Sequence, residues 1–157
     1  MLKFLVLTYL TLTFLIADIK AQGFKEIEPI HSNCEDVEKI LKIKACSLSR
    51  VNFETDNQEI DIFISNDKCE ETVSGRYNVP VGTILGVRVV YKDSALLPKL
   101  EEFTQDLTGF KKSQDDISYF YFNFEKGVEY MVTPDHWVRV IYYFPSQTYK
   151  HLLCKKQ

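Results

Sequence analysis

The 157-residue chain lacks the motifs of several common catalytic and cofactor-binding sites. It has no glycine-rich phosphate loop and no G-x-S-x-G segment, so two frequent frameworks for phosphate binding and serine hydrolysis are missing. It has no C-x-x-C and no H-x-x-x-H spacing, which are common patterns of zinc ligands. We therefore expect neither a cofactor nor a metal. Internal repeats and long linkers are also missing, which favours one domain.

Neither sign of charge is in large excess. The chain has 19 Lys and Arg against 22 Asp and Glu, a formal net charge of −3. Loss of Lys3, Asp18 and Lys20 with a leader peptide leaves 17 basic and 21 acidic residues, hence −4. Because nucleic acids and anionic bilayers bind basic surfaces, neither is an expected partner.

Only one apolar run is long, and it lies at the N-terminus. Lys3 precedes the largely apolar residues 4–17, and the small residue Ala21 follows them. This layout is typical of a signal peptide, which we place at residues 1–21. The run is shorter than the roughly 20 apolar residues that span a bilayer. We expect an exported periplasmic or extracellular protein, with residues 22–157 as a single globular domain and no stable membrane insertion. An uncleaved anchor is the alternative.

Four cysteines follow the leader, at positions 34, 46, 69 and 154. An even number of cysteines in an exported chain favours two disulfides. Zinc is the alternative. His31 and Cys34 lie close together in the sequence, but their spacing is not a zinc pattern.

A short helix is predicted within residues 31–42. Ser32 or Asn33 can cap its free amides, acidic residues follow in the first turn, and lysines occupy the last. Apolar residues recur along one stripe, at Cys34, Val37, Ile40 and Leu41. We expect this stripe to pack on a sheet.

A β-hairpin is predicted around Asp56 and Asn57. With these residues as the turn, the facing pairs are Phe53 with Ile60, Val51 with Ile62, and Ser49 with Ile64. Apolar side chains then coincide on one face. Continuing the register places Cys46 opposite Asp67, close to Cys69. The register therefore predicts the disulfides Cys46–Cys69 and Cys34–Cys154.

A strand at residues 83–92 and a three-stranded antiparallel meander over residues 117–144 are predicted next. Gly127 and Pro134 mark the breaks in the meander, because glycine accepts a positive φ and proline removes a ladder donor. Residues 93–114 show no clear pattern, since Pro98 interrupts an apolar spacing that would suit a helix. The expected fold class is α+β, a short helix packed on an antiparallel sheet and stapled by disulfides.

The first strand of the meander carries phenylalanine on one side and tyrosine on the other. Phe120, Phe122 and Phe124 share one face, while Tyr119 and Tyr121 share the other. We assign the phenylalanine face to the core. The tyrosine face is then a candidate surface patch, unless the helix or a loop covers it and satisfies its hydroxyls.

This patch and the last strand together form the predicted binding surface. Its residues are Tyr119, Tyr121, Trp137, Arg139, Tyr142 and Tyr143. Tyrosine, tryptophan and arginine are enriched at protein interfaces. The predicted function is therefore the binding of a protein or envelope component, without catalysis.

Two other functions stay open. An open sheet edge would suit an envelope assembly or structural factor. A small hydrolase would use one of the histidines, His31, His136 or His151. Asp135 precedes His136, but adjacent residues on a strand or turn usually point apart, so the two are not expected to act as a pair.

Short blocks of the chain form a recognisable series. They lie at residues 31–41 (H-S-x-x-x-D-V-E-x-I-L), 67–69 (D-x-C), 79–85 (V-P-x-G-T-I-L), 122–130 (F-N-x-E-x-G-V-x-Y) and 141–146 (I-x-Y-x-P-S). The series resembles a group of small, secreted, functionally uncharacterised proteins of soil bacteria. Typical members have glycine where this chain has Lys42. The helix and hairpin are more distantly similar, in architecture alone, to units of outer-membrane assembly lipoproteins and of the β-lactamase inhibitory protein.

Overall fold

The structure, a computed structural model, describes residues 23–155. The predicted signal peptide at residues 1–21 lies outside that range. The regular elements are α1 (Cys34–Leu41), β1 (Arg50–Glu54), β2 (Gln58–Ile64), β3 (Glu70–Thr72), β4 (Gly75–Tyr77), β5 (Ile84–Tyr91), η1 (Ser94–Leu96), η2 (Leu100–Glu102), β6 (Lys111–Gln114), β7 (Tyr119–Asn123), β8 (Val128–Val132), β9 (Val138–Tyr143) and η3 (Gln147–Leu152). The α+β class is confirmed. Within the described range, no helix has the length and apolar character needed to cross a membrane.

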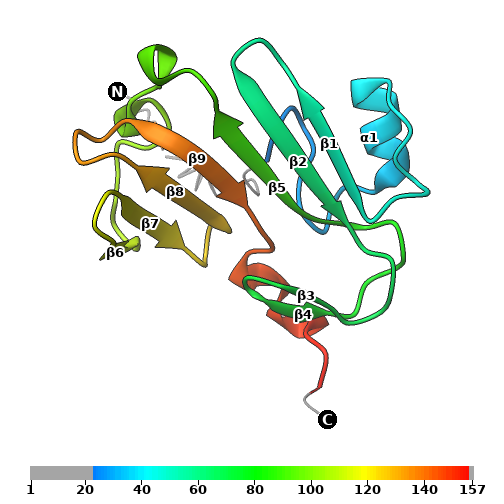
Figure 1. Cartoon of the computed structure of the whole chain (residues 1–157). Coiled ribbons are helices and arrows are strands. Elements are labelled where there is room, and N and C mark those ends of the chain that lie inside the picture. The colour runs from blue at the N-terminus through cyan, green and yellow to red at the C-terminus, as the bar shows by residue number, and fades with distance from the viewer. Residues whose placement is uncertain (1–22, 156–157) are drawn as a thin grey trace, which may run out of the picture.

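Seven strands form one antiparallel sheet in the order β1-β2-β5-β9-β8-β7-β6 (Figure 1). β3 and β4 form a separate two-stranded hairpin. The predicted meander is confirmed as β7, β8 and β9. β9 returns between β5 and β8, so it joins the first half of the sheet to the meander.

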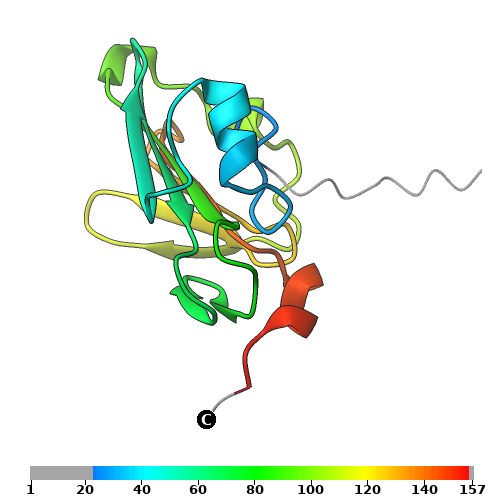
Figure 2. The same ribbon diagram turned by 90° about the vertical axis from the view of Figure 1, so that its right-hand side faces the viewer.

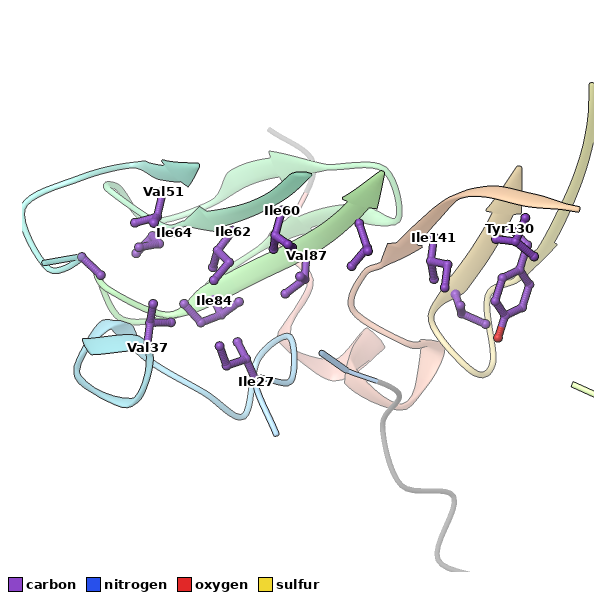
Figure 3. Packing of buried hydrophobic residues seen from close by; sticks show 14 of the residues in the cluster. Ile27, Val37, Val51, Ile60, Ile62, Ile64, Ile84, Val87, Tyr130 and Ile141 are labelled. Atoms are coloured by element: carbon purple, nitrogen blue, oxygen red, sulfur yellow. The ribbon is translucent and has the colours of Figure 1, made fainter. Parts of the chain in front are cut away.

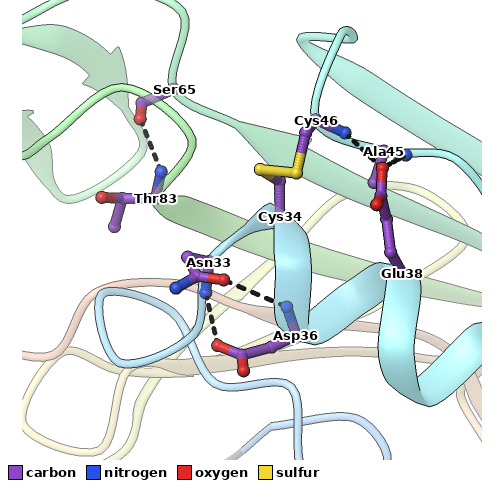
Figure 4. Close-up of a disulfide and its surroundings, with 8 residues drawn as sticks. All are labelled: Asn33, Cys34, Asp36, Glu38, Ala45, Cys46, Ser65 and Thr83. Carbon is purple, nitrogen blue, oxygen red and sulfur yellow. Dashed lines mark hydrogen bonds between the residues drawn. A yellow bond between two sulfur atoms is a disulfide. The ribbon is translucent and has the colours of Figure 1, made fainter.

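The helix α1 begins and ends at polar residues that satisfy its free backbone groups. The Asn33 side chain accepts a hydrogen bond from the Asp36 amide, and the Asp36 carboxylate accepts one from the Asn33 amide, both at 3.0 Å (Figure 4). Lys42 ends the helix with φ at 59°, the left-handed conformation that glycine often supplies. A helix of eight residues is marginal alone, so the burial of Cys34 and Val37 holds it on the sheet.

The predicted register of the first hairpin is confirmed. Val51 faces Ile62 and Phe53 faces Ile60, and the Ile64 amide donates to the Ser49 carbonyl at 2.8 Å. The isoleucines of β2 project toward α1 and the N-terminal segment, which contribute Val37 and Ile27 among other residues to the core (Figure 3).

The predicted disulfide pairing is wrong. The bonds are Cys34–Cys46 and Cys69–Cys154, not Cys46–Cys69 and Cys34–Cys154. The residues that precede Ser49 fold back onto α1. There the Glu38 carboxylate accepts hydrogen bonds from the amides of Ala45 at 2.8 Å and Cys46 at 3.0 Å (Figure 4). The hairpin ladder therefore stops before it reaches Cys46.

The second disulfide joins the C-terminal segment to the small hairpin of β3 and β4. The Asn78 amide donates to the Leu152 carbonyl at 2.8 Å, and the Cys154 amide donates to the Arg76 carbonyl at 2.9 Å. A small apolar cluster of Tyr77, Val79 and Leu85 lies beside these bonds. In both views this unit lies below the large sheet, next to η3 (Figures 1 and 2).

The assignment of the phenylalanine face to the core is also wrong. Tyr121 pairs with Tyr130, which pairs with Ile141, and all three are buried in the main core; Figure 3 shows Tyr130 and Ile141 there. Phe120, Phe122 and Phe124 are therefore on the opposite face, where each is half-buried. The neighbouring strand β8 fixes this orientation, because its buried residues Val128, Tyr130 and Val132 all point to the core side.

The segment between β5 and β6 covers the tyrosines. Pro98 separates the two short turns η1 and η2, and Leu100 is buried beneath them. The rings of Phe103 and Phe110 lie 5.8 and 5.9 Å from the Tyr130 ring, measured between centroids. Tyr130 is thus under a loop, and its partner on β7, Tyr121, is buried in the same cluster. This agrees with the alternative in which the tyrosine face is covered.

Candidate functional site

One face of the large sheet points away from α1. α1 and the N-terminal segment lie to the right of the sheet in Figure 2; we call the other side of the sheet the open face. Side chains from all seven strands line up across it as cross-strand neighbours, in the order Asn52, Asp61, Arg88, Tyr142, Glu129, Phe122 and Lys111. We call this line the central row. It alternates charged, polar and aromatic groups.

Asp61 anchors one half of the central row. Its buried carboxylate accepts hydrogen bonds from Arg50 Nε at 2.8 Å, Arg88 Nε at 2.9 Å and Asn52 Nδ2 at 2.9 Å. Both guanidinium groups also pair with it at 2.6 Å through Nη2. Burial alone would raise the pKa of Asp61, but the bonds from Asn52, Arg50 and Arg88 together hold that pKa below its usual value. The group is therefore ionised and fully paired at neutral pH.

A chain of aromatic rings crosses the open face and includes two members of the central row, Phe122 and Tyr142. Phe122 contacts Phe124, Phe124 contacts Phe144, and Phe144 contacts Tyr142, with centroid distances of 5.5, 5.7 and 5.9 Å. Tyr142 then meets Phe63 at 6.0 Å. These edge-on and tilted contacts are favourable arrangements of aromatic rings.

A glycine makes room for one of these rings. A Cβ atom added at Gly86 would lie 2.8 Å from the Tyr142 hydroxyl oxygen and 3.0 Å from its ring. Tyr142 therefore lies close over the backbone of β5. A side chain at position 86 would require the end of the Tyr142 side chain to move.

Three shallow hollows follow one another along the open face. The first, of about 230 Å³, is lined by Val73, Phe122, Phe124, Glu129 and Phe144. The second, of about 180 Å³, is lined by Arg88, Phe120, Glu129, Met131, Val140 and Tyr142. The third, of about 290 Å³, is lined by Val90, Tyr91, Lys92, Ser94, Leu97, Met131, Arg139 and Val140. Shared residues join each hollow to the next, so the three form one groove.

Glu129 stands at the junction of the first two hollows. Its neighbours in the central row are the rings of Phe122 and Tyr142, and burial raises the pKa of its carboxyl group. Among residues 23–155 we find neither a hydrogen bond nor an ion pair of this carboxylate. A half-buried acid without a partner costs stability, which makes Glu129 the strongest candidate for a ligand-binding group.

The structure does not bring the predicted binding residues together on one surface. Tyr121 and Tyr143 are on the covered side, where burial raises the pKa of Tyr143 to about 12. Tyr119, also packed against the core, contacts the His136 ring. Tyr142 alone belongs to the central row of the open face.

Trp137 and Arg139 lie where β9 begins. The Trp137 ring is exposed and receives the Lys99 ammonium group 5.0 Å from its centroid. Arg139 lies at a register shift between β8 and β9 and lines the third hollow. These two residues therefore lie at an end of the strand, and Arg139 is at the rim of the groove.

The histidines lie apart from the groove lining. The His31 ring packs on Tyr149, the His136 ring on Tyr119 and Tyr121, and His151 Nδ1 lies 3.1 Å from the Thr148 carbonyl oxygen. Within residues 23–155, no histidine forms an ion pair with a carboxylate.

One group of potential metal ligands lies close together, comprising Glu35 and the sulfur atoms of Cys34 and Cys46. The two sulfur atoms are joined in a disulfide, so they offer no thiolates to a metal ion. This group is therefore a disulfide with a nearby carboxylate.

A further hollow lies away from the sheet. It measures about 590 Å³ and surrounds the Cys69–Cys154 disulfide, with Ser74, Arg76 and Lys155 among its lining residues. It adjoins the C-terminal end of the described range. Aromatic rings do not line it, so the groove on the open face is the better site.

The architecture and the groove define a disulfide-stapled α+β domain with one covered and one open sheet face. No protein-family model, no curated protein sequence and no solved structure matches the chain. The resemblance to small secreted proteins of soil bacteria therefore stays a prediction.

Proposed function

We propose that the chain is an exported binding protein without catalytic activity, and that the open face of its sheet takes a protein partner. The observation that carries this proposal is the aromatic groove around Glu129, because α1 and the N-terminal segment pack on the other side of the sheet, while the small hairpin of β3 and β4 borders the groove at Val73. Large aromatic side chains that are half-exposed contribute much of the binding energy at protein interfaces.

The disulfides support the exported location. All four cysteines of the chain are paired, and such bonds persist in oxidising compartments. The N-terminal signal-peptide pattern gives independent support for the same proposal. Together they favour the periplasm or the extracellular space.

An open sheet edge has less support as a binding element. The edge strand β6 carries Lys111 and Lys112, and lysine on an edge strand opposes the addition of another strand. We therefore place the partner on the face of the sheet, not on its edge.

We expect threonine at both Phe120 and Val140 to lower partner binding at least about tenfold, which corresponds to about 1.4 kcal/mol. Both side chains line the second hollow, and threonine keeps the preference for strand structure. The measurement compares the partners that the oxidised parent and the variant retain from envelope extract and culture fluid.

The matched control carries threonine at Leu48 and Val81, two exposed apolar residues outside the groove. This control should retain every partner of the parent. Equal recovery of partners by the groove variant and the parent would reject the open face. Loss of a hydrolytic activity on replacing His31, His136 or His151 by alanine, with the fold intact, would favour the hydrolase alternative.

A further inference from the structure

We infer that the open face binds an extended basic segment of a partner protein, with the cationic group of one arginine or lysine seated at Glu129 between Phe122 and Tyr142. This inference rests on the proposed function, because it names the chemistry of the ligand. It follows from the charge at the centre of the groove and from the groups on either side of that charge.

The surroundings of Glu129 suit a cation better than any other group. Glu129 lines both the first and the second hollow, so a side chain that enters either hollow comes close to it. The two residues beside it in the central row, Phe122 and Tyr142, are aromatic, and the face of an aromatic ring attracts a cation. A charge-assisted hydrogen bond to the carboxylate would add to these contacts.

The same face already holds a completed arrangement of this kind. The Arg50 guanidinium lies 2.6 Å from the Asp61 carboxylate and 5.6 Å from the centroid of the Phe63 ring. Glu129 has a carboxylate and neighbouring rings as well, but no cation among residues 23–155 pairs with it. Arg88 and Lys111 are each two positions from Glu129 along the row: Arg88 is held by Asp61, and among residues 23–155 Lys111 forms no ion pair with Glu129.

The first and second hollows indicate which side chains would flank the basic residue of the ligand. The first and second hollows flank Glu129, and their other linings are mostly apolar and aromatic. A segment with apolar side chains on either side of its basic residue would fill both. An acidic segment is disfavoured by Glu129 itself and by the net charge of −3 on the chain.

Matched peptides test the inference on the full oxidised protein. Three short capped peptides share the same alternating leucine and serine residues and differ only at the centre, which is arginine, citrulline or glutamate. Citrulline keeps the shape of arginine without its charge. Fluorescence anisotropy of labelled peptides gives each affinity. We expect the arginine peptide to bind about tenfold or more tightly than the citrulline peptide.

Two variants of the protein locate the charge that is recognised. Glu129→Gln should bind the arginine and citrulline peptides equally, whereas Glu125→Gln, in the exposed turn after β7, should keep the preference of the parent. Glu129→Gln should fold, with a thermal midpoint at neutral pH no lower than that of the parent, because it removes a half-buried charge. A midpoint well below the parent value would instead assign Glu129 a structural role and overturn the inference.

The remaining outcomes separate the inference from the proposed function. Equal affinity of the parent for the arginine and citrulline peptides, or a preference that persists in Glu129→Gln, overturns the basic ligand. In either case, if threonine at Phe120 and Val140 abolishes the charge-independent binding of the peptides, the open face of the parent is still the binding surface and the proposed function stands. Binding that is insensitive to those two changes, or a self-associated protein that no peptide dissociates, overturns both.

Discussion

Replacing both Cys69 and Cys154 by serine is expected to lower the free energy of unfolding by about 4 kcal/mol. The bond closes a loop between residues 85 positions apart, and the entropy that a crosslink removes from the unfolded chain grows with loop length. Since small domains are stable by only about 5–15 kcal/mol, the variant should retain little margin. Urea unfolding of the oxidised parent and the variant measures the difference.

The shorter disulfide provides the matched control. Cys34 and Cys46 are only 12 residues apart, so serine at both positions should cost less, about 3 kcal/mol. Hydrogen exchange gives a local readout for the longer bond. The amides of Asn78 and Cys154, which donate to Leu152 and Arg76, should lose protection first. Peptide mapping that finds Cys46 joined to Cys69 would contradict the structure.

Replacing Asp61 by alanine is expected to cost about 2–3 kcal/mol. The change leaves Arg50, Arg88 and Asn52 without their shared acceptor on the open face. The loss should stay below that for a wholly buried triad, because the arginine side chains are 51% and 42% exposed and water can solvate them. Chemical unfolding at neutral pH measures it.

The effect of Asp61 should depend on pH in one direction. Its pKa in the folded protein is held below the usual value, so its stabilising effect is complete above the unfolded pKa of about 3.9 and fades as pH falls through the lower folded value. The difference between the parent and the alanine variant should therefore shrink in acid. Asp61→Asn keeps the size of the side chain and should show the same pH trend. A difference that stays constant down to strong acid would contradict the ion-pair account.

The sequence predicted correctly those parts of the fold that depend on local signals. The register of the first hairpin follows from the turn at Asp56 and Asn57, because that turn aligns apolar residues of both strands. A cap at Ser32 or Asn33 follows from the acidic first turn of the helix, and the structure has it at Asn33. The meander follows from its breaks at Gly127 and Pro134.

The disulfides were not predictable in this way, because the register was extended past the ends of the strands. Glu38 binds the backbone of the chain before β1, and Ser65 turns the chain after β2 toward Thr83. Neither contact belongs to the β1–β2 ladder, so the alternation of side chains along the two strands does not predict them. The short hairpin of β3 and β4 was also missed. Each of its strands has only three residues, which is too few to show an alternating pattern.

The core face of β7 was predicted wrongly because β7 was interpreted alone. Phenylalanine is the more apolar residue, but Tyr121 is buried through its pairing with Tyr130 on β8. The alternation in β8 was the available signal, since Glu129 and Met131 alternate with three apolar core residues. Glu129 then marks the open face, and its two neighbouring strands supply the rings around it.

Site-specific photocrosslinking tests the central claim most directly. Benzoylphenylalanine in place of Phe122, at the edge of the first hollow, should form a covalent adduct with the partner in native culture fluid or envelope extract. The same group in place of Leu48, an exposed residue outside the groove, should form none. Adducts from position 48 without adducts from position 122, or equal adducts from both, would contradict a partner bound to the open face.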